Sequence, residues 1–217
     1  MKIKLFEFNM FPVNSYVLSD ETNEAVIIDA GCYFPQDEQN LKQYIEDNNL
    51  TVKHLLNTHL HLDHVFGNAF VERTFGVKPE ASEADEFLLA RLEQQCRMFG
   101  FEPNEPTVAL GTHLKGGDKV TFGNTTIDVI DVPGHSPGGL AYYIASEHCL
   151  FSGDSLFKGS IGRTDLEGGD FEALHNAVCT RLFTLPSETV VYPGHGEHTT
   201  IGFEKMNNTF FRKGGRR

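Results

Sequence analysis

The sequence predicts an α+β fold in which two β-sheets pack face to face and helices cover their outer sides. Short apolar runs typical of strands recur in both halves of the 217-residue chain, and each half also contains stretches with apolar residues at helical spacing. No internal repeat or low-complexity linker separates the halves. We therefore expect one domain, residues 1–217, built of sheets and helices packed in layers.

The first half is expected to begin with three strands and to continue with alternating helices and strands. Residues 26–28, Val-Ile-Ile, form the apolar run of a buried strand. Leu41, Tyr44 and Ile45 fall on one face of a helix. The predicted elements are strands over residues 2–8, 15–18 and 25–29, a helix over 36–49, a strand over 52–57 and a helix over 65–75.

The middle of the chain is expected to form a helical lid, followed by a second β-rich half. Phe87, Leu88 and Leu92 share one face of a helix over residues 83–99, and Pro103 and Pro106 follow it. We assign the lid-like segment to residues of about 80–106. The second half is predicted to contain strands over 119–122, 126–132, 140–145, 149–152 and 189–192, a helix over 171–182 and a short helical piece after His198.

Charge and composition exclude some classes of function. The formal net charge is -12, whereas nucleic-acid binding depends on clustered Lys and Arg, so we expect no nucleic-acid partner. The terminal residues Arg212, Lys213, Arg216 and Arg217 are basic, and we interpret them as a frayed end. No apolar stretch is long enough to cross a membrane, so no membrane partner is expected.

The cysteines and the N-terminal residues indicate the compartment. Cys32, Cys96, Cys149 and Cys179 are scattered without close pairing, which fits a reducing environment better than a disulfide framework. Residues 3–8 alternate between apolar and polar side chains, unlike the continuous apolar region of a secretion signal. We therefore expect a cytoplasmic protein.

Candidate metal ligands follow the strand predicted over residues 52–57. They are His59, His61, Asp63 and His64. The turn can direct the two alternate histidines at one point, while the start of the next helix presents Asp63 and His64 at another. Imidazole nitrogens and carboxylate oxygens are ligands of zinc, and a catalytic zinc keeps one position open for water. The spacing therefore favours two adjacent metal ions.

Three further candidate ligands lie in glycine-rich turns of the second half. Each follows a predicted strand: His135 in Pro-Gly-His-Ser-Pro-Gly, Asp154 in Ser-Gly-Asp, and His195 in Pro-Gly-His-Gly. A single histidine or aspartate in such a turn is usually structural. Because three of them follow three strands, we expect them to share one site with the first cluster.

The motif His-x-His-x-Asp-His at residues 59–64, followed by His135, Asp154 and His195, resembles the metallo-β-lactamase superfamily over nearly the whole chain. The resemblance implies a four-layer αββα sandwich. Within the superfamily the chain is most similar to the glyoxalase II group, the hydroxyacylglutathione hydrolases, in their small single-domain bacterial form. Residues 153–157, 162–166 and 168–170 carry this similarity, which the persulfide dioxygenases share.

The resemblance also implies a role for each candidate residue. The first metal would be held by His59, His61 and His135, and the second by Asp63, His64 and His195, with Asp154 bridging the two. Two zinc ions per chain are implied, with iron as an alternative. Asp29 matches the family's aspartate that braces the histidine loop from behind the ligands, and the alternative is a turn or cap residue before Gly31.

The implied activity is hydrolysis of a small thioester or ester by a metal-bound hydroxide. Asp63 is expected to orient the hydroxide as well as to bind metal, so no serine or cysteine nucleophile is needed. Because two divalent ions outweigh the charges of Asp63, Asp154 and one hydroxide, the site should favour a small anionic substrate. Arg163 is a candidate anchor for a substrate carboxylate, and the alternative is that it holds its own loop in place by pairing with Asp165, Asp170 or Glu167.

Residue differences separate the related classes. β-Lactamases resemble the chain less because they lack a carboxylate at the position of Asp154, and the iron flavoproteins carry glutamate in place of His61. Lactone hydrolases place a tyrosine where this chain has residues 155–157, Ser-Leu-Phe. Full-length glyoxalase II has a C-terminal helical domain that helps to bind glutathione, whereas this sequence ends shortly after His195. We therefore expect the thioester chemistry to carry over better than the preference for glutathione.

Two other functions remain open from the sequence. The first is a single-iron persulfide dioxygenase, because that family shares the same ligand sequence. The second is a non-catalytic metal-binding module, which the complete set of seven ligands argues against. The sequence is silent on the oligomeric state.

Overall fold

Two six-stranded sheets form the centre of the molecule. The first contains, in order of hydrogen bonding, β1 (Lys2–Phe8), β2 (Val13–Ser19), β3 (Glu24–Ile28), β4 (Thr51–Leu56), β5 (Pro79–Ala81) and β6 (Thr112–His113). The second contains β14 (Thr199–Thr200), β13 (Val190–Pro193), β10 (Cys149–Gly153), β9 (Leu140–Ile144), β8 (Thr125–Asp131) and β7 (Lys119–Phe122). A small two-stranded sheet pairs β11 (Leu156–Phe157) with β12 (Ser160–Ile161).

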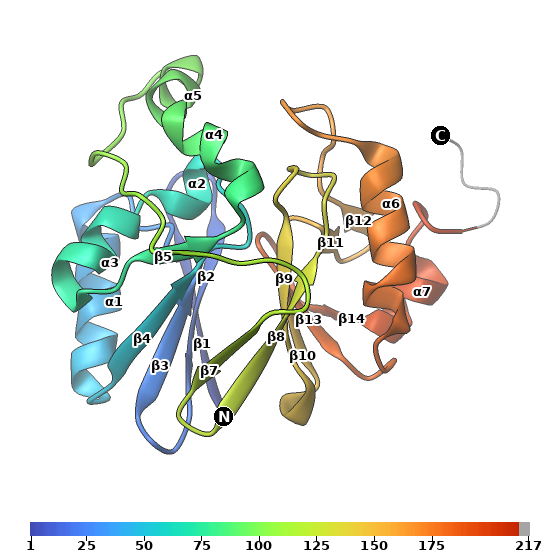
Figure 1. The fold of residues 1–217 in the computed structure, drawn as a ribbon, viewed down its shortest axis with the longest axis horizontal. Helices are drawn as coiled ribbons and strands as arrows, with labels where there is room; N and C mark the ends of the chain where they lie inside the picture. The colour runs from blue at the N-terminus through green and yellow to red at the C-terminus, as the bar shows by residue number, and fades with distance from the viewer. Residues whose placement is uncertain (213–217) are drawn as a thin grey trace.

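Helices cover the outer faces of both sheets in the computed structural model, which describes residues 1–212 (Figure 1). On the first sheet lie α1 (Pro35–Asp47) and α3 (Asn68–Phe75), and on the second lie α6 (Phe171–Thr180) and α7 (Ile201–Asn207). This confirms the predicted four-layer αββα sandwich. The basic residues Lys213, Arg216 and Arg217 lie outside the described residues.

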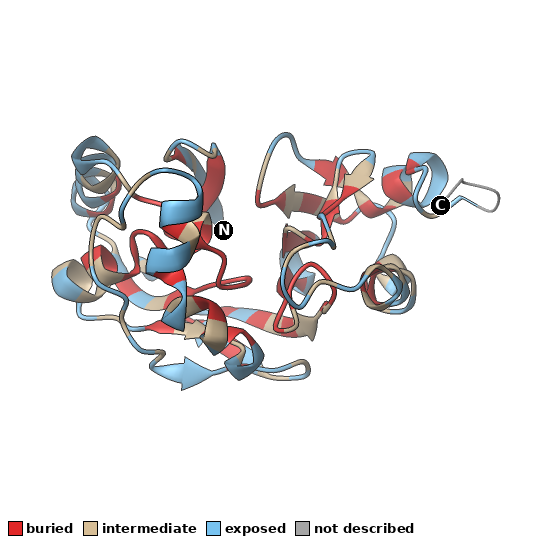
Figure 2. Ribbon diagram, turned by 90° about the horizontal axis from the view of Figure 1, so that it is seen from above, coloured by how far each residue is buried: buried red, intermediate tan, exposed pale blue. Residues whose placement is uncertain are grey.

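The strand β3 shows how the sandwich is held together. Its side chains alternate, so Val26 and Ile28 pack between the two sheets while Ala25 and Ile27 pack with Leu41 of α1 on the outer face. All four of these strand residues are buried. Burial of both faces explains the continuous apolar run in the sequence. Viewed from above, the buried residues follow the sheets and the exposed ones lie on the outward sides of the helices (Figure 2).

Parallel strand pairs bring the predicted ligands to one edge of the sandwich. In the first sheet β3 and β4 are parallel, and in the second sheet β10 and β13 are parallel. The carboxyl ends of such pairs share an edge, so the residues that follow them meet there. Asp29 follows β3, the 59–64 cluster follows β4, Asp154 follows β10 and His195 follows β13.

Two predicted helices are interrupted. The helix expected over 65–75 is wrong in extent, because α2 (Leu62–Val65) ends before Gly67 and α3 begins after it. A Cβ at Gly67 would lie 2.7 Å from the carbonyl oxygen of Ala30, so the chain is pressed against its neighbour where the helix breaks. The lid helix expected over 83–99 consists of a 3₁₀ turn at Glu83–Asp85, then α4 (Glu86–Ala90) and α5 (Leu92–Met98). None of the helices in residues 1–212 has the length and apolar character needed to span a membrane.

Candidate metal centre

The structure brings all seven predicted ligands together at the shared edge. Their ligand atoms form three groups, each within 4.8 Å: His59, His61 and His135; His59, His64 and Asp154; and Asp63, His64 and His195. The first and third groups correspond to the two clusters expected from the sequence. The second group places Asp154 between them.

Asp154 contacts both clusters. Its Oδ1 lies 3.5 Å from Nε2 of His64, and its Oδ2 lies 3.6 Å from Nε2 of His135 and 3.6 Å from Nε2 of His195. A carboxylate in this place can serve two cations at once. The approach depends on Gly194, because a Cβ there would lie 2.2 Å from Oδ1 of Asp154.

The unsatisfied polar atoms of the cluster fit a pair of cations. Within residues 1–212, Nε2 of His59, Nε2 of His64 and Oδ1 of Asp154 are buried and have no hydrogen-bond partner. Buried polar atoms without partners are rare in folded proteins, and here three of them gather at one point. Imidazole and carboxylate donors in this number are typical of zinc and iron sites. The residues present therefore fit two divalent ions.

The pKa shifts of the histidines differ between the two clusters. Burial and the neighbouring His64 hold the pKa of His59 well below its usual value, and burial with His135 lowers the pKa of His61 to about 4. Both rings are therefore neutral at pH 7, as ligands must be. Burial also opposes protonation of His64 and His195, but the carboxylates of Asp63 and Asp154 outweigh it and raise both pKa values. The second cluster thus carries the excess negative charge.

The outer nitrogens of three ligands are held by the surrounding chain. Nδ1 of His64 lies 3.0 Å from Oδ2 of Asp29, Nδ1 of His135 lies 2.7 Å from the carbonyl oxygen of Arg163, and Nδ1 of His195 lies 3.0 Å from that of Pro12. Such contacts fix the orientation of a metal-binding ring.

Asp29 braces the histidine loop from beneath, in the place that the sequence predicts. Its Oδ1 accepts a 2.7 Å hydrogen bond from the backbone N–H of Thr58, and its Oδ2 accepts one of 2.6 Å from the Thr58 hydroxyl. Asp29 also has a φ of 52°, so it occupies a left-handed turn as well. Asp29 thus contacts the histidine loop through its side chain and forms a turn through its backbone.

A second buried carboxylate, Asp85, was missed by the sequence analysis. Its side chain accepts hydrogen bonds from the Ser136 hydroxyl at 2.7 Å, from Gly138 N–H at 2.5 Å and from Leu60 N–H at 3.3 Å. Burial raises the pKa of Asp85, although these hydrogen bonds oppose the shift. The carboxylate joins the lid to the turn of His59 and His61 and to the turn of His135. A single aspartate in a helical segment gives no sequence signal for this role.

A cavity of about 410 Å³ lies over the cluster. Its floor is formed by His61, Asp63, His135, Asp154 and His195. One wall comes from α4 and α5 of the lid segment, and the opposite wall comes from the loop after β12. The volume lies within the range of about 300–1,000 Å³ that is usual for small-molecule sites.

Arg163 lines this cavity, but its guanidinium is paired. Its Nε and Nη2 donate hydrogen bonds of 2.8 and 2.9 Å to the two carboxylate oxygens of Asp165. The pairing lowers the pKa of Asp165 to about 2. Both side chains are more than half exposed, so the pair is weak and open to exchange.

Residues 9–195 match the family model of the Metallo-beta-lactamase superfamily. The chain belongs to this superfamily. At the level of the superfamily, the protein is a metal-dependent hydrolase. Within the superfamily, it is 34% identical over 211 residues to a protein of Haemophilus influenzae named hydroxyacylglutathione hydrolase GloC, covering 97% of this chain and 98% of that protein.

Two solved structures of the superfamily are also similar to the chain over almost their whole length. The B3 metallo-beta-lactamase BLEG-1 is 35% identical, with a TM-score of 0.89 and coverage of 98% of this chain and 100% of that one. The protein TTHA1623, in a di-iron-bound form, is 32% identical, with a TM-score of 0.84 and coverage of 97% and 100%. The similarity to BLEG-1 runs against the expectation that β-lactamases resemble this chain less.

Proposed function

We propose that this superfamily member hydrolyses a small thioester or ester, with a hydroxyacyl thioester as the leading candidate. One observation carries the proposal: five residues of the seven-residue cluster form the floor of a cavity whose described lining residues include no serine, cysteine, threonine or lysine. With no side-chain nucleophile of these types at hand, the attacking group comes from water.

The cofactor of the proposed enzyme is a pair of zinc ions, with iron as the alternative. His59, His61 and His135 would hold one ion and Asp63, His64 and His195 the other, with Asp154 contacting both. When bound, such ions polarise a carbonyl oxygen and lower the pKa of water towards about 7. The di-iron form of TTHA1623 supports keeping iron in the test.

Asp63 is the residue to which we assign a direct catalytic role. Its Oδ2 lies 3.2 Å from Nε2 of His195, so it belongs to the cluster, and it also lines the cavity. Its carboxylate can therefore accept a hydrogen bond from the attacking water and orient it towards the substrate carbonyl. Addition of water at that carbon and cleavage of the C–S bond yield a carboxylic acid and a thiol.

The substrate proposal includes an anionic end. Arg163 lies on the wall of the cavity, and its exposed pair with Asp165 can exchange for a substrate carboxylate at small energetic cost. The name of the Haemophilus influenzae relative supports a hydroxyacylglutathione as the first substrate to test.

The decisive experiment separates three reactions with one protein preparation. Metal content is measured first, and protein loaded with zinc or with iron is then given S-lactoylglutathione in anaerobic buffer. Release of free thiol in the zinc-loaded sample supports the proposal. A parallel sample receives a persulfide in aerobic buffer, and oxygen uptake there with no thioester cleavage in the first sample would instead establish the dioxygenase.

A β-lactam arm is included because of the similarity to BLEG-1. A chromogenic cephalosporin is assayed with the same metal-loaded protein. Ring opening that is faster than thioester cleavage would overturn the proposal in favour of a β-lactamase. Metal binding without any of the three activities would support the non-catalytic module.

A further inference from the structure

One side of the active-site cavity is apolar. Phe11, Leu62, Leu88, Met98 and Phe99 line it, and we call these five residues the apolar wall. Leu62 and Leu88 are buried, whereas Met98 and Phe99 keep 77% and 57% of their surface exposed. The rings of Phe11 and Phe99 are in edge contact, with centroids 5.3 Å apart. The wall therefore has a packed base and an open apolar rim.

The apolar wall starts directly at the ligand cluster. Leu62 stands between His61 and Asp63 in the chain. Phe11 precedes Pro12, whose carbonyl oxygen contacts Nδ1 of His195. If the scissile carbonyl of a substrate lies over the cluster, a substituent next to that carbonyl would contact the apolar wall.

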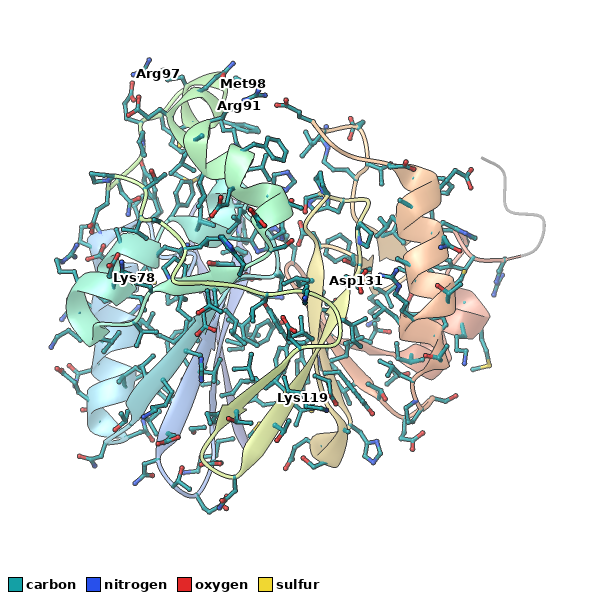
Figure 3. All side chains as sticks on the ribbon, viewed as in Figure 1. Lys78, Arg91, Arg97, Met98, Lys119 and Asp131 are labelled. Carbon is teal, nitrogen blue, oxygen red and sulfur yellow. The ribbon has the colours of Figure 1, made fainter. Side chains whose placement is uncertain are left out.

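No unpaired charge stands among the described residues on the lid side of the cavity. The cation there is Arg91, which forms an ion pair with Glu167 of the opposite loop. The polar neighbours Gln94 and Gln95 are neutral amides, and the amide of Gln95 already donates a 2.9 Å hydrogen bond to the carbonyl oxygen of Leu88. Figure 3 shows Arg91 and Met98 on the side of the lid that faces the second half of the molecule. This side therefore offers apolar contact and little charge recognition.

We propose that the substrate carries an apolar alkyl or aryl group next to its scissile carbonyl and that this group binds the apolar wall. The polar end of the substrate then points to the Arg163 side of the cavity. This inference rests on the proposed hydrolase function and narrows its substrate class. A fully buried methylene changes an equilibrium about fourfold, so a half-open wall predicts about two- to fourfold per added carbon.

The test uses two series of thioesters with the metal-loaded enzyme. In the first series the acyl group grows from acetyl to hexanoyl on the neutral thiol N-acetylcysteamine. In the second the acyl group stays acetyl and the thiol grows from methyl to butyl. We expect kcat/KM to rise about two- to fourfold per carbon over the first carbons of one series, which also identifies the side of the carbonyl that meets the wall. A flat or falling rate in both series, with thioesters still hydrolysed, would refute the inference alone.

Matched variants assign the effect to the wall. Met98→Gln and Phe99→Ala should reduce the preference for hexanoyl over acetyl, or for butyl over methyl, by about three- to tenfold. Met206→Gln and Phe203→Ala serve as controls, because these residues lie on α7 and are 69% and 41% exposed. Equal changes in wall and control variants would contradict the assignment.

A binding measurement keeps the inference separate from the proposed function. Non-hydrolysable S-alkyl thioethers of N-acetylcysteamine are titrated calorimetrically into metal-free protein. The Kd should fall with chain length for the natural sequence and fall less steeply in Met98→Gln. If no thioester is cleaved but the Kd falls with chain length, the hydrolase proposal is refuted and the inference that the wall binds an apolar group is supported. If thioesters are cleaved and the Kd is independent of chain length, that inference is refuted and the hydrolase proposal is supported.

Discussion

The hydroxyl of Ser136 donates a 2.7 Å hydrogen bond to Asp85, which links the turn of His135 to the lid. In Asp85→Asn one acceptor oxygen becomes an N–H donor, so either this hydroxyl or Gly138 N–H loses its acceptor. We expect the free energy of unfolding to fall by about 1–3 kcal/mol and metal affinity to fall by about 10- to 100-fold. Thermal unfolding and metal titration measure the two effects. Glu83→Gln, at an exposed position of the same turn, is the control, and unchanged metal affinity in Asp85→Asn would contradict the role.

Each of the six ligands His59, His61, His64, His135, Asp154 and His195 should be needed for a full complement of metal. Replacement of any one by alanine is expected to deplete metal and activity together, with the fold retained. Removing metal with a chelator should lower the Tm of the natural protein more than that of the variants, because a metal ion that binds only the folded state stabilises that state. His198→Ala, an exposed histidine three positions after His195, should match the natural protein in metal content per chain. A variant that keeps its full metal content and full turnover would show that the replaced residue is not a metal ligand.

Asp63→Asn separates metal binding from positioning of the nucleophile. The amide keeps one oxygen that can bind metal but is a weaker hydrogen-bond acceptor than a carboxylate. We expect kcat to fall more, at least about tenfold, than the metal content does. Elemental analysis beside steady-state kinetics makes the comparison. A variant that loses metal but keeps its rate per bound metal would rule out the double role.

Arg163→Ala distinguishes two roles for this residue, binding a substrate carboxylate and holding its own loop in place through Asp165. If Arg163 exchanges Asp165 for a substrate carboxylate, kcat/KM for a carboxylate-bearing thioester should fall by about 10- to 150-fold, and that for a neutral thioester should change little. Asp165→Asn frees the guanidinium and should not reproduce the loss. Equal losses for charged and neutral substrates in both variants, or mainly a lower Tm, would show that the Arg163–Asp165 pair only holds the loop.

His54 should make stability depend on pH. Its Nδ1 lies 2.6 Å from Oε1 of Glu80, and its Nε2 lies 3.0 Å from the carbonyl oxygen of Thr121 on the other sheet. The hydrogen bond with Glu80 raises the pKa of His54 above 6.5, although burial and Lys53 oppose the shift. Because the folded-state pKa is the higher one, the stabilisation is complete below the unfolded pKa and is lost as pH rises through the folded pKa.

The measurement for His54 is a comparison of unfolding free energies at two pH values. His54→Gln should lose about 1 kcal/mol more at about pH 5.5 than at about pH 9. In a double-mutant cycle with Glu80→Gln the two losses should not add at the lower pH. A loss that is the same at both pH values would show that His54 acts through packing alone.

Much of the fold could be predicted because its long strands and helices repeat an apolar pattern. The strand over residues 2–8 has the predicted bounds, and α1, β4, β8, β9 and β10 differ from their predicted bounds by at most two residues at either end. The short strands β5, β6 and β14 were not predicted, because two or three residues carry no periodicity and are held by their partners. The break at Gly67 was also missed, because it results from a contact with Ala30, which lies far away in the sequence.

The sequence by itself determined the candidate ligands. The 59–64 cluster lies within one turn and the start of a helix, and His135, Asp154 and His195 each follow a strand, so the local sequence pattern indicates them. Only the tertiary structure decided that Asp85 reaches Leu60 and Ser136, and that an apolar wall lines the cavity beside the cluster. The physical reason is that these contacts join segments far apart in the chain, so the packing of the lid on the sandwich creates them and no local pattern encodes them.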